Sequence, residues 1–169
     1  KNNSSNGQQP GILTIKQAIQ QISGFGYILN SLNILSPAGR KELFSLPFLT
    51  NQNDIETAMD ETETAFNIVN TTENERLLSV LFSRLTQLRD ISGTVRLLST
   101  KNTLTDIELF EIKHFALLAE SVRELAGQLK ISFAAIPVLE KIIDILDPEK
   151  KRIPHFYVYD RYSPALAAL

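Results

Sequence analysis

A chain of 169 residues suits one domain or one domain with a short appendage, and an apolar fraction of 43% is normal for a protein that buries a core. Its 17 Lys and Arg against 19 Asp and Glu leave a net charge of −2, which excludes a globally basic surface that would attract nucleic acid. The absence of cysteine excludes disulfides, thiolate nucleophiles and cysteine-ligated metals, and it is consistent with a reducing compartment.

The first segment, residues 1–11, is rich in Asn, Ser and Gln and is expected to be a flexible polar leader, because it buries too little apolar surface to offset its ordering entropy. It lacks the apolar stretch of a secretory signal, and no later apolar run approaches the roughly 20 residues that span a bilayer. Since the chain opens with Lys1 rather than Met and stops at Leu169 inside an apolar run, we expect it to be a piece of a longer protein.

The first predicted helix begins after Thr14. Thr14 followed by Gln17 is a capping-box signature, and apolar residues recur at helical spacing from there to Gly26. Gly24 and Gly26 weaken this helix, so that a kink or close packing is expected near Phe25.

Two helices are predicted between Ser36 and Val69. Ser36 before Pro37 combines an N-cap with a proline at the first helical position, and this helix is expected to end near Leu46, before Pro47. The next helix begins near residue 51, and its apolar face comprises Ile55, Ala58, Met59, Thr62, Ala65, Phe66 and Val69. The opposite stripe superficially offers paired carboxylates for acid–base chemistry, but its spacing indicates a solvated helix surface; it consists of Glu56, Asp60 and Glu63.

Further capping signals divide the next stretch into a medium helix, a short helix and a long helix. Thr72 with Glu75 predicts a capping box that opens a helix through residue 85, and a short helix is predicted over residues 94–99. Thr105 with Glu108 predicts the cap of the longest helix, which reaches residue 129 and would be roughly 35–40 Å long at 1.5 Å per residue. Its predicted core positions include Phe110, Phe115, Leu118 and Leu125.

The last predicted core helix opens at Ser132 and ends at Asp147-Pro148, with Pro137 near its first turn. The residues Ile153 to Tyr159 are strand-like, and Ser163-Pro164 repeats the helix-start signal of Ser36-Pro37. We therefore predict an all-α fold, a bundle of about seven helices with a short extended connector near the C-terminus. The expected segments are the leader 1–11, a helical core over 12–147, a connector over 148–162 that could form a short strand, and the start of a truncated lever helix over 163–169.

Residues that could carry catalysis are scarce. No stretch matches a phosphate-binding loop, and Gly24-Phe25-Gly26 lacks the third glycine and the preceding strand of a dinucleotide site. His114 and His155 lie far apart in sequence and lack metal-ligand spacing, and His114 is expected to be a partly exposed residue on a polar helix side that includes Lys113. We therefore predict no catalytic, cofactor-binding or metal-ligating residue and no small-molecule substrate.

One basic cluster stands out, formed by Lys150, Lys151 and Arg152. Three adjacent positive charges could make weak contacts with DNA phosphates, but Glu149 and Asp147 weaken the local positive field, and so short a run is more often a solvated loop. A nearby aromatic patch, whose expected role is packing onto the helices rather than base stacking, comprises Phe156, Tyr157, Tyr159 and Tyr162.

Four short motifs occur in order along the chain. The first is Leu35-Ser36-Pro37-Ala38-Gly39-Arg40 followed by spaced leucines at 43, 46 and 49, and the second is Ile55-Glu56 with Thr62-Glu63-Thr64-Ala65. The third is Leu88-Arg89-Asp90-Ile91 with Leu97-Leu98 and Asp106-Ile107-Glu108-Leu109. The fourth is Leu146-Asp147-Pro148 with Tyr162-Ser163-Pro164-Ala165-Leu166. In this order the motifs resemble the core region that precedes the ATPase domain in the MutS family of DNA mismatch repair proteins. The family's mismatch-reading Phe-x-Glu motif and its Walker motifs do not occur in this sequence.

The resemblance implies a helical body that couples an ATPase at one end to a lever and clamp around DNA at the other. ATP and Mg²⁺ would then be cofactors of the full-length protein and not of this segment. DNA would be its partner, the full-length protein would form a homodimer, and its location would be cytoplasmic without membrane contact. The alternative is a stand-alone helical adaptor that binds a partner protein through an exposed apolar groove.

Overall fold

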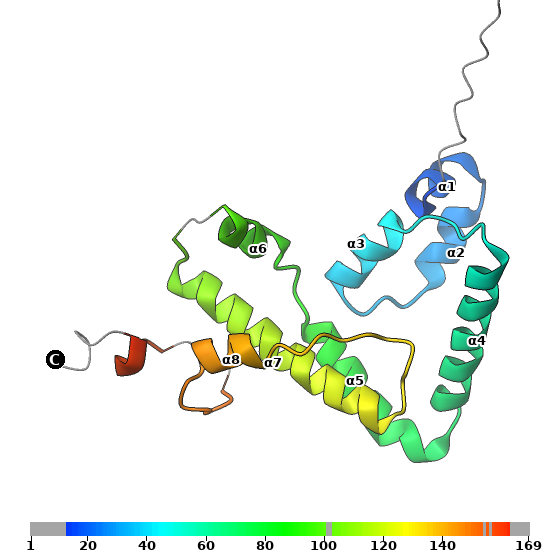
Figure 1. Ribbon diagram of the computed structural model, residues 1–169. Coiled ribbons are helices and arrows are strands. Elements are labelled where there is room, and N and C mark those ends of the chain that lie inside the picture. The colour runs from blue at the N-terminus through cyan, green and yellow to red at the C-terminus, as the bar shows by residue number, and fades with distance from the viewer. Residues whose placement is uncertain (1–12, 101–102, 154, 156, 163–169) are drawn as a thin grey trace, which may run out of the picture. The chain divides into compact units, whose positions relative to one another are not determined.

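The computed structural model describes residues 13–100, 103–153, 155 and 157–162, and within them the chain is all-α (Figure 1). Those residues contain eight α-helices and two short 3₁₀-helices, and they contain no strand beyond an isolated bridge between Thr14 and Pro47. The prediction of an all-α multi-helix fold is confirmed. The chain divides into two compact units, residues 1–60 and 61–169. The sequence predicted a single helical core over 12–147 and did not separate these two units.

The first unit contains α1 (Ile15–Gln21), α2 (Phe25–Ser31), α3 (Pro37–Ser45) and the start of α4 (Gln52–Val69). The predicted capping box of α1 is present, since the Thr14 hydroxyl accepts from the backbone of Gln17 and the Gln17 side chain accepts from Thr14. The predicted first helix breaks into α1 and α2 because Gly24 adopts a left-handed conformation with φ 82°. This break accounts for one helix more than the seven expected.

The start of α3 also follows the prediction. The Ser36 hydroxyl accepts a hydrogen bond from the backbone of Gly39, and Pro37 occupies the first helical position. The residues after α3 return to the start of α1, because the Ile15 amide donates to the Leu46 carbonyl and the Phe48 amide donates to the Leu13 carbonyl.

The second unit contains the end of α4, the 3₁₀-helix η1 (Thr72–Asn74), α5 (Glu75–Gln87), α6 (Ser92–Ser99), α7 (Asp106–Gln128), α8 (Glu140–Leu146) and the 3₁₀-helix η2 (Asp160–Tyr162). In Figure 1, α7 is the longest helix of this unit, α5 lies along it and α8 packs against it. The predicted capping box of Thr105 and Glu108 is present at the start of α7. A core cluster joins α5 to α7 and consists of Leu78, Leu81, Val122, Leu125 and Leu129.

Two predictions for the second unit are wrong in detail. The capping box of Thr72 and Glu75 does not form, because Thr72 lies in η1 and α5 begins only at Glu75. The helix predicted from Ser132 begins at Glu140, since Pro137 would remove a helical hydrogen bond and disfavours helical geometry in the preceding residue. The short strand that the connector could have formed is not present among its described residues, which run without a pairing strand into η2.

The predicted apolar face of α4 is present in sequence but has no buried residue in the structure. Met59 and Phe66 are 67% and 66% exposed, and Ile55 and Val69 are also exposed. The opposite carboxylate stripe of Glu56, Asp60 and Glu63 lies on the solvated surface, as predicted. The leader 1–11 and the predicted lever start 163–169 lie outside the described residues.

Candidate functional site

A buried ion pair lies between α7 and the end of α8. Lys113, in the second turn of α7, places its Nζ 3.1 Å from Oδ1 of Asp147, and both side chains are 0% exposed. The same Nζ donates a second hydrogen bond of 2.8 Å to the backbone carbonyl of His155. Lys113 therefore links three segments of the second unit: α7, the residue that ends α8, and the connector over 148–162.

Asp147 accepts further hydrogen bonds from the connector. Its Oδ1 also accepts from the Tyr159 hydroxyl at 3.1 Å, and its Oδ2 accepts from the backbone amide of Arg152 at 2.7 Å. Burial on its own would raise the pKa of the Asp147 carboxyl, but the hydrogen bonds from Arg152, Lys113 and Tyr159 outweigh burial and lower this pKa below its ordinary value. The carboxylate is therefore ionised and held on both oxygens. We call these four residues and the His155 carbonyl the Asp147 network.

The connector has a tight turn that the Asp147 network stabilises. Lys150 and Arg152 have φ angles of 53° and 54°, in the left-handed region that non-glycine residues rarely adopt. The Lys150 amide donates to the Asp147 carbonyl, and the Arg152 amide donates to the Asp147 side chain. Conformations of this kind persist where the surrounding structure fixes them, so the turn depends on Asp147.

The aromatic patch packs as the sequence predicts at its centre. Tyr159 is buried, its ring centroid lies 6.1 Å from that of Tyr157 and 5.5 Å from that of Tyr162, and both contacts are edge-on. Burial and the hydrogen bond to ionised Asp147 raise the pKa of the Tyr159 hydroxyl to about 12. Phe156 lies outside the described residues.

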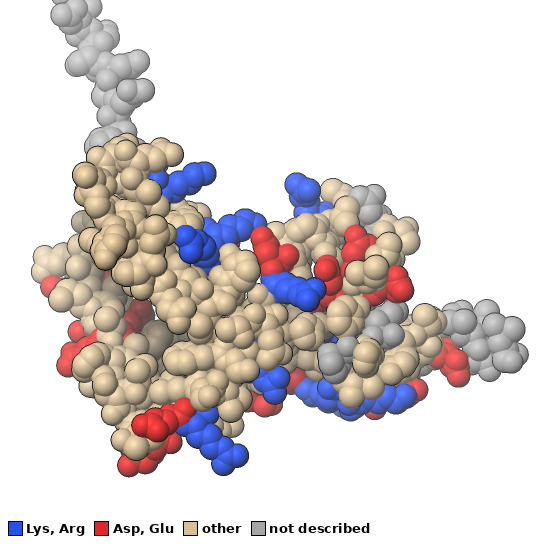
Figure 2. All heavy atoms as spheres, turned by 180° about the vertical axis from the view of Figure 1, so that it is seen from behind, with Lys and Arg blue, Asp and Glu red and all other residues tan. Residues whose placement is uncertain are grey.

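The basic cluster of Lys150, Lys151 and Arg152 is exposed, but two of its three charges are paired. Lys151 forms an ion pair of 2.7 Å with Glu149, and Arg152 pairs with Glu120 of α7. In Figure 2, Lys and Arg side chains are interspersed with Asp and Glu on the visible face and do not form one continuous basic surface. Phosphate contact by this cluster stays a prediction, and it would require exchange of these carboxylate partners for phosphates.

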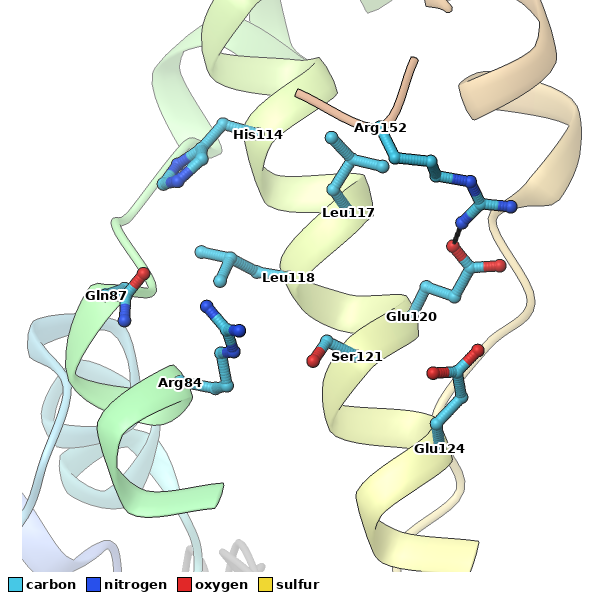
Figure 3. Close-up of a pocket in the computed structure, with 9 residues that line it drawn as sticks. All are labelled: Arg84, Gln87, His114, Leu117, Leu118, Glu120, Ser121, Glu124 and Arg152. Carbon is cyan, nitrogen blue, oxygen red and sulfur yellow. Dashed lines mark hydrogen bonds and ion pairs between the residues drawn. The ribbon is translucent and has the colours of Figure 1, made fainter. Parts of the chain in front are cut away.

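A pocket of about 270 Å³ lies between α5, α7 and the connector (Figure 3). We call it the α5–α7 pocket, and it is lined by Arg84, Gln87, His114, Leu117, Leu118, Glu120, Ser121, Glu124 and Arg152. Figure 3 shows Arg84 and Gln87 of α5 directed toward α7, from which His114 and Ser121 face them, while the Glu120–Arg152 pair lies on the other side of α7. The Nε of Arg84 is buried and has no hydrogen-bond partner.

The two histidines have separate environments. His114 is partly exposed, as predicted; its ring stacks on Phe110 at 5.7 Å, and burial, followed by the charge of Arg89, lowers its pKa below the ordinary value. His155 contributes its backbone carbonyl to the Asp147 network. Within residues 13–100, 103–153, 155 and 157–162, no group of three His, Cys, Asp or Glu side chains is placed to hold a metal ion.

The assignment of Lys113 to the polar side of its helix is wrong. Lys113 precedes Ala116 and Leu117 by three and four residues, which places it on one face with them, and Asp147 supplies the counter-charge that permits its burial. Two features of the sequence could have indicated this buried pair. One is a lysine at helical spacing from apolar residues, and the other is an acidic residue at the end of a predicted helix. Pairing the two requires the tertiary fold, because they are 34 positions apart.

A second hollow is lined only by apolar residues. It has a volume of about 450 Å³ and lies where α5 and α7 meet the segment before α8. We call it the apolar groove; its lining includes Leu81, Leu85, Phe115, Val122, Ile131, Phe133 and Ile136. It is the feature that an adaptor would need.

Comparison with family models found no match, and neither curated proteins nor solved structures yielded one. Among the helices in the described part of the chain, none is long and apolar enough to cross a membrane.

Proposed function

We propose that this chain is a non-catalytic helical core segment of a DNA-binding ATPase similar to MutS, in which it couples ATP hydrolysis to clamping on DNA. The proposal starts from the four ordered motifs of the sequence. In this proposal ATP and Mg²⁺ bind elsewhere in the complete protein, and two copies act together on DNA. This segment transmits conformational changes from the ATPase site to the DNA clamp.

The Asp147 network is the observation that carries the proposal. Coupling requires elements that shift as units, because well-packed helices move between discrete arrangements rather than deforming continuously. The Lys113–Asp147 ion pair, together with the bonds from Arg152 and Tyr159, fastens the connector to the 23-residue helix α7. The connector leads toward residue 163, where the proposed lever begins. A displacement of α7 would therefore be passed to the connector through buried, charge-assisted hydrogen bonds.

The test uses the complete protein in which this chain occurs. ATP turnover is measured with and without duplex DNA, for the wild type, for Lys113→Met and for Lys141→Met, whose lysine is exposed on α8. The expected result is that Lys113→Met retains nucleotide binding but loses most of the DNA-dependent change in turnover, while Lys141→Met behaves as the wild type. Full coupling in a folded Lys113→Met protein would remove the Asp147 network from the mechanism.

A stand-alone adaptor is the second candidate, and the apolar groove favours it. The exposed face of α4, with Met59 and Phe66, would provide a further contact surface. The two functions differ in one simple respect. A complete protein that neither hydrolyses ATP nor binds DNA would defeat the coupling proposal and leave the adaptor.

A further inference from the structure

We propose that α4 is the docking site for an amphipathic helix of a partner protein, a helix whose polar flanks carry Lys and Arg. This inference goes beyond the coupling function and is independent of it, since it rests on one face of α4 that takes no part in the Asp147 network. We call this face the α4 stripe, and it consists of Ile55, Met59, Thr62, Phe66 and Val69.

The α4 stripe has the spacing of a surface on which two helices pair. Its members follow one another at intervals of four, three, four and three residues, the alternation that keeps a contact seam on one side of a helix. In Figure 1, α4 is one uninterrupted helix, so the five positions lie along a single line on its surface. Apolar residues in this register are typical of a helix that packs against another element, and not of one that faces water.

The stripe is nevertheless exposed in the folded chain. α4 has no buried residue, and the stripe residues Met59, Phe66 and Val69 are 67%, 66% and 53% exposed. Contiguous exposed apolar surface of this kind marks an interaction site. Methionine and aromatic side chains are enriched at interfaces, and methionine adapts its shape to different partners.

The charges of α4 select the partner. The helix carries five acidic residues and no Lys or Arg. Glu56 and Glu63 each follow a stripe residue directly and so line one edge of the stripe, the position at which paired helices form ion pairs with each other. Glu56 accepts a hydrogen bond from the neutral Gln52 side chain, which does not cancel its charge. A partner helix with Lys or Arg along its flank supplies the opposite charge.

The same charges disfavour other occupants of the stripe. Two copies of α4 side by side would bring two acidic helices together without a basic residue between them, and like charges in contact weaken such a pair. Nucleic acid and anionic lipid carry the same sign of charge as α4 and are repelled by it. A protein helix with basic flanks matches both the apolar stripe and its acidic edge.

The test is a titration of the full chain into fluorescently labelled synthetic peptides, followed by fluorescence anisotropy. The basic peptide has about three heptads, with leucine at the two seam positions and lysine at the flanking positions, whose like charges keep it from pairing with itself. The acidic peptide carries glutamate in place of each lysine. We expect saturable binding of the basic peptide that weakens as the salt concentration rises, and no saturable binding of the acidic peptide.

Met59→Glu interrupts the apolar stripe and also adds a negative charge. The matched control is Ile107→Glu in the first turn of α7, because Ile107 is likewise 67% exposed. Met59→Glu should weaken binding of the basic peptide by about tenfold or more, the range for a central interface residue, and Ile107→Glu should not weaken it. Attraction by charge alone would instead make Met59→Glu bind this peptide more tightly. Both variants should unfold at the same urea concentration as the wild type, since neither side chain is buried.

A second variant tests the charged edge separately. Glu56→Gln combined with Glu63→Gln should weaken binding of the basic peptide and reduce its salt dependence. The matched control is Glu140→Gln combined with Asp144→Asn on the exposed surface of α8, which removes the same charge and should leave binding unchanged.

Four results would overturn the assignment. The first is no saturable binding of the basic peptide to the wild type, and the second is equal binding of the basic and acidic peptides, which would mean an apolar surface without charge selection. The third is unchanged binding to Met59→Glu, which would place the peptide elsewhere on the chain. The fourth is a Met59→Glu variant that unfolds at a lower urea concentration or loses self-association seen in the wild type, because the stripe would then be covered by this chain or by a second copy of it.

Discussion

Replacing Lys113 with Met tests how much the buried ion pair contributes to stability. Methionine keeps most of the length of the lysine but removes the charge, so that Asp147 stays buried without its counter-charge and the His155 carbonyl loses a donor. Removing one partner of a buried pair typically destabilises by about 3–5 kcal/mol, because the remaining charge is desolvated and uncompensated. A whole domain is stable by only about 5–15 kcal/mol, so this loss is a large fraction of the total.

Urea denaturation of the chain, followed by circular dichroism, measures this change in the free energy of unfolding. The matched control is Lys141→Met on the exposed surface of α8, which should change stability by no more than about 0.5 kcal/mol. The double variant Lys113→Met with Asp147→Asn should be less destabilised than the sum of the two single variants, by about 0.5–3 kcal/mol, because the residues share one network. A Lys113→Met variant as stable as Lys141→Met would refute the argument that this pair holds the connector on α7.

Three further predictions concern the core, the response to pH and binding to DNA. Leu118→Ala on α7 should lower the free energy of unfolding in urea by about 2–5 kcal/mol, because Leu118 is buried. Glu124→Ala, on the exposed side of α7, should lower it by only about 0.5 kcal/mol. Glu120→Ala is a poorer control, since the Glu120 side chain is only 14% exposed and pairs with an arginine. Folding raises the pKa of Tyr159 to about 12 from 10.0, so its stabilising contribution is complete below pH 10 and is lost as the pH rises toward 12. Tyr159→Phe should therefore flatten the alkaline part of a curve of unfolding free energy against pH. An unchanged alkaline part would contradict Tyr159 as the cause. The isolated chain should bind duplex DNA weakly and with a shallow salt dependence, since the 150–152 cluster offers three charges, and submicromolar affinity at about 0.15 M salt would mean a missed DNA site.

Local signals in the sequence were sufficient for most helix boundaries. The caps at Thr14, Ser36 and Thr105 form as predicted, because a capping hydroxyl and the amide it accepts from lie within three residues of each other. The cap at Thr72 failed although its pattern was the same, and Glu75 instead opens α5 directly after η1. Such a pattern favours a cap but is not sufficient for one, because the preceding turn geometry can override it.

The candidate site was much harder to predict than the helices. The sequence identified the basic cluster and the aromatic patch, which are contiguous, but it did not indicate that Lys113 is buried. A buried lysine is favourable only with its counter-charge, and Asp147 reaches Lys113 only because α8 packs against α7 in the folded chain. The α5–α7 pocket also could not be predicted from the sequence, because the residues that line it, such as Arg84 and Ser121, lie on different helices.

The Asp147 network and the α5–α7 pocket share one residue, and this sharing has a measurable consequence. The backbone amide of Arg152 is held by Asp147, while its side chain lines the pocket and neutralises Glu120. Loosening the connector through Lys113→Met should release Arg152 and leave Glu120 unpaired, so the Arg152–Glu120 pair should contribute less to the stability of that variant. In urea denaturation, Glu120→Gln should therefore destabilise the wild type more than it destabilises Lys113→Met. Equal costs of Glu120→Gln in the two proteins would show that the pocket and the network are energetically independent, even though they share Arg152.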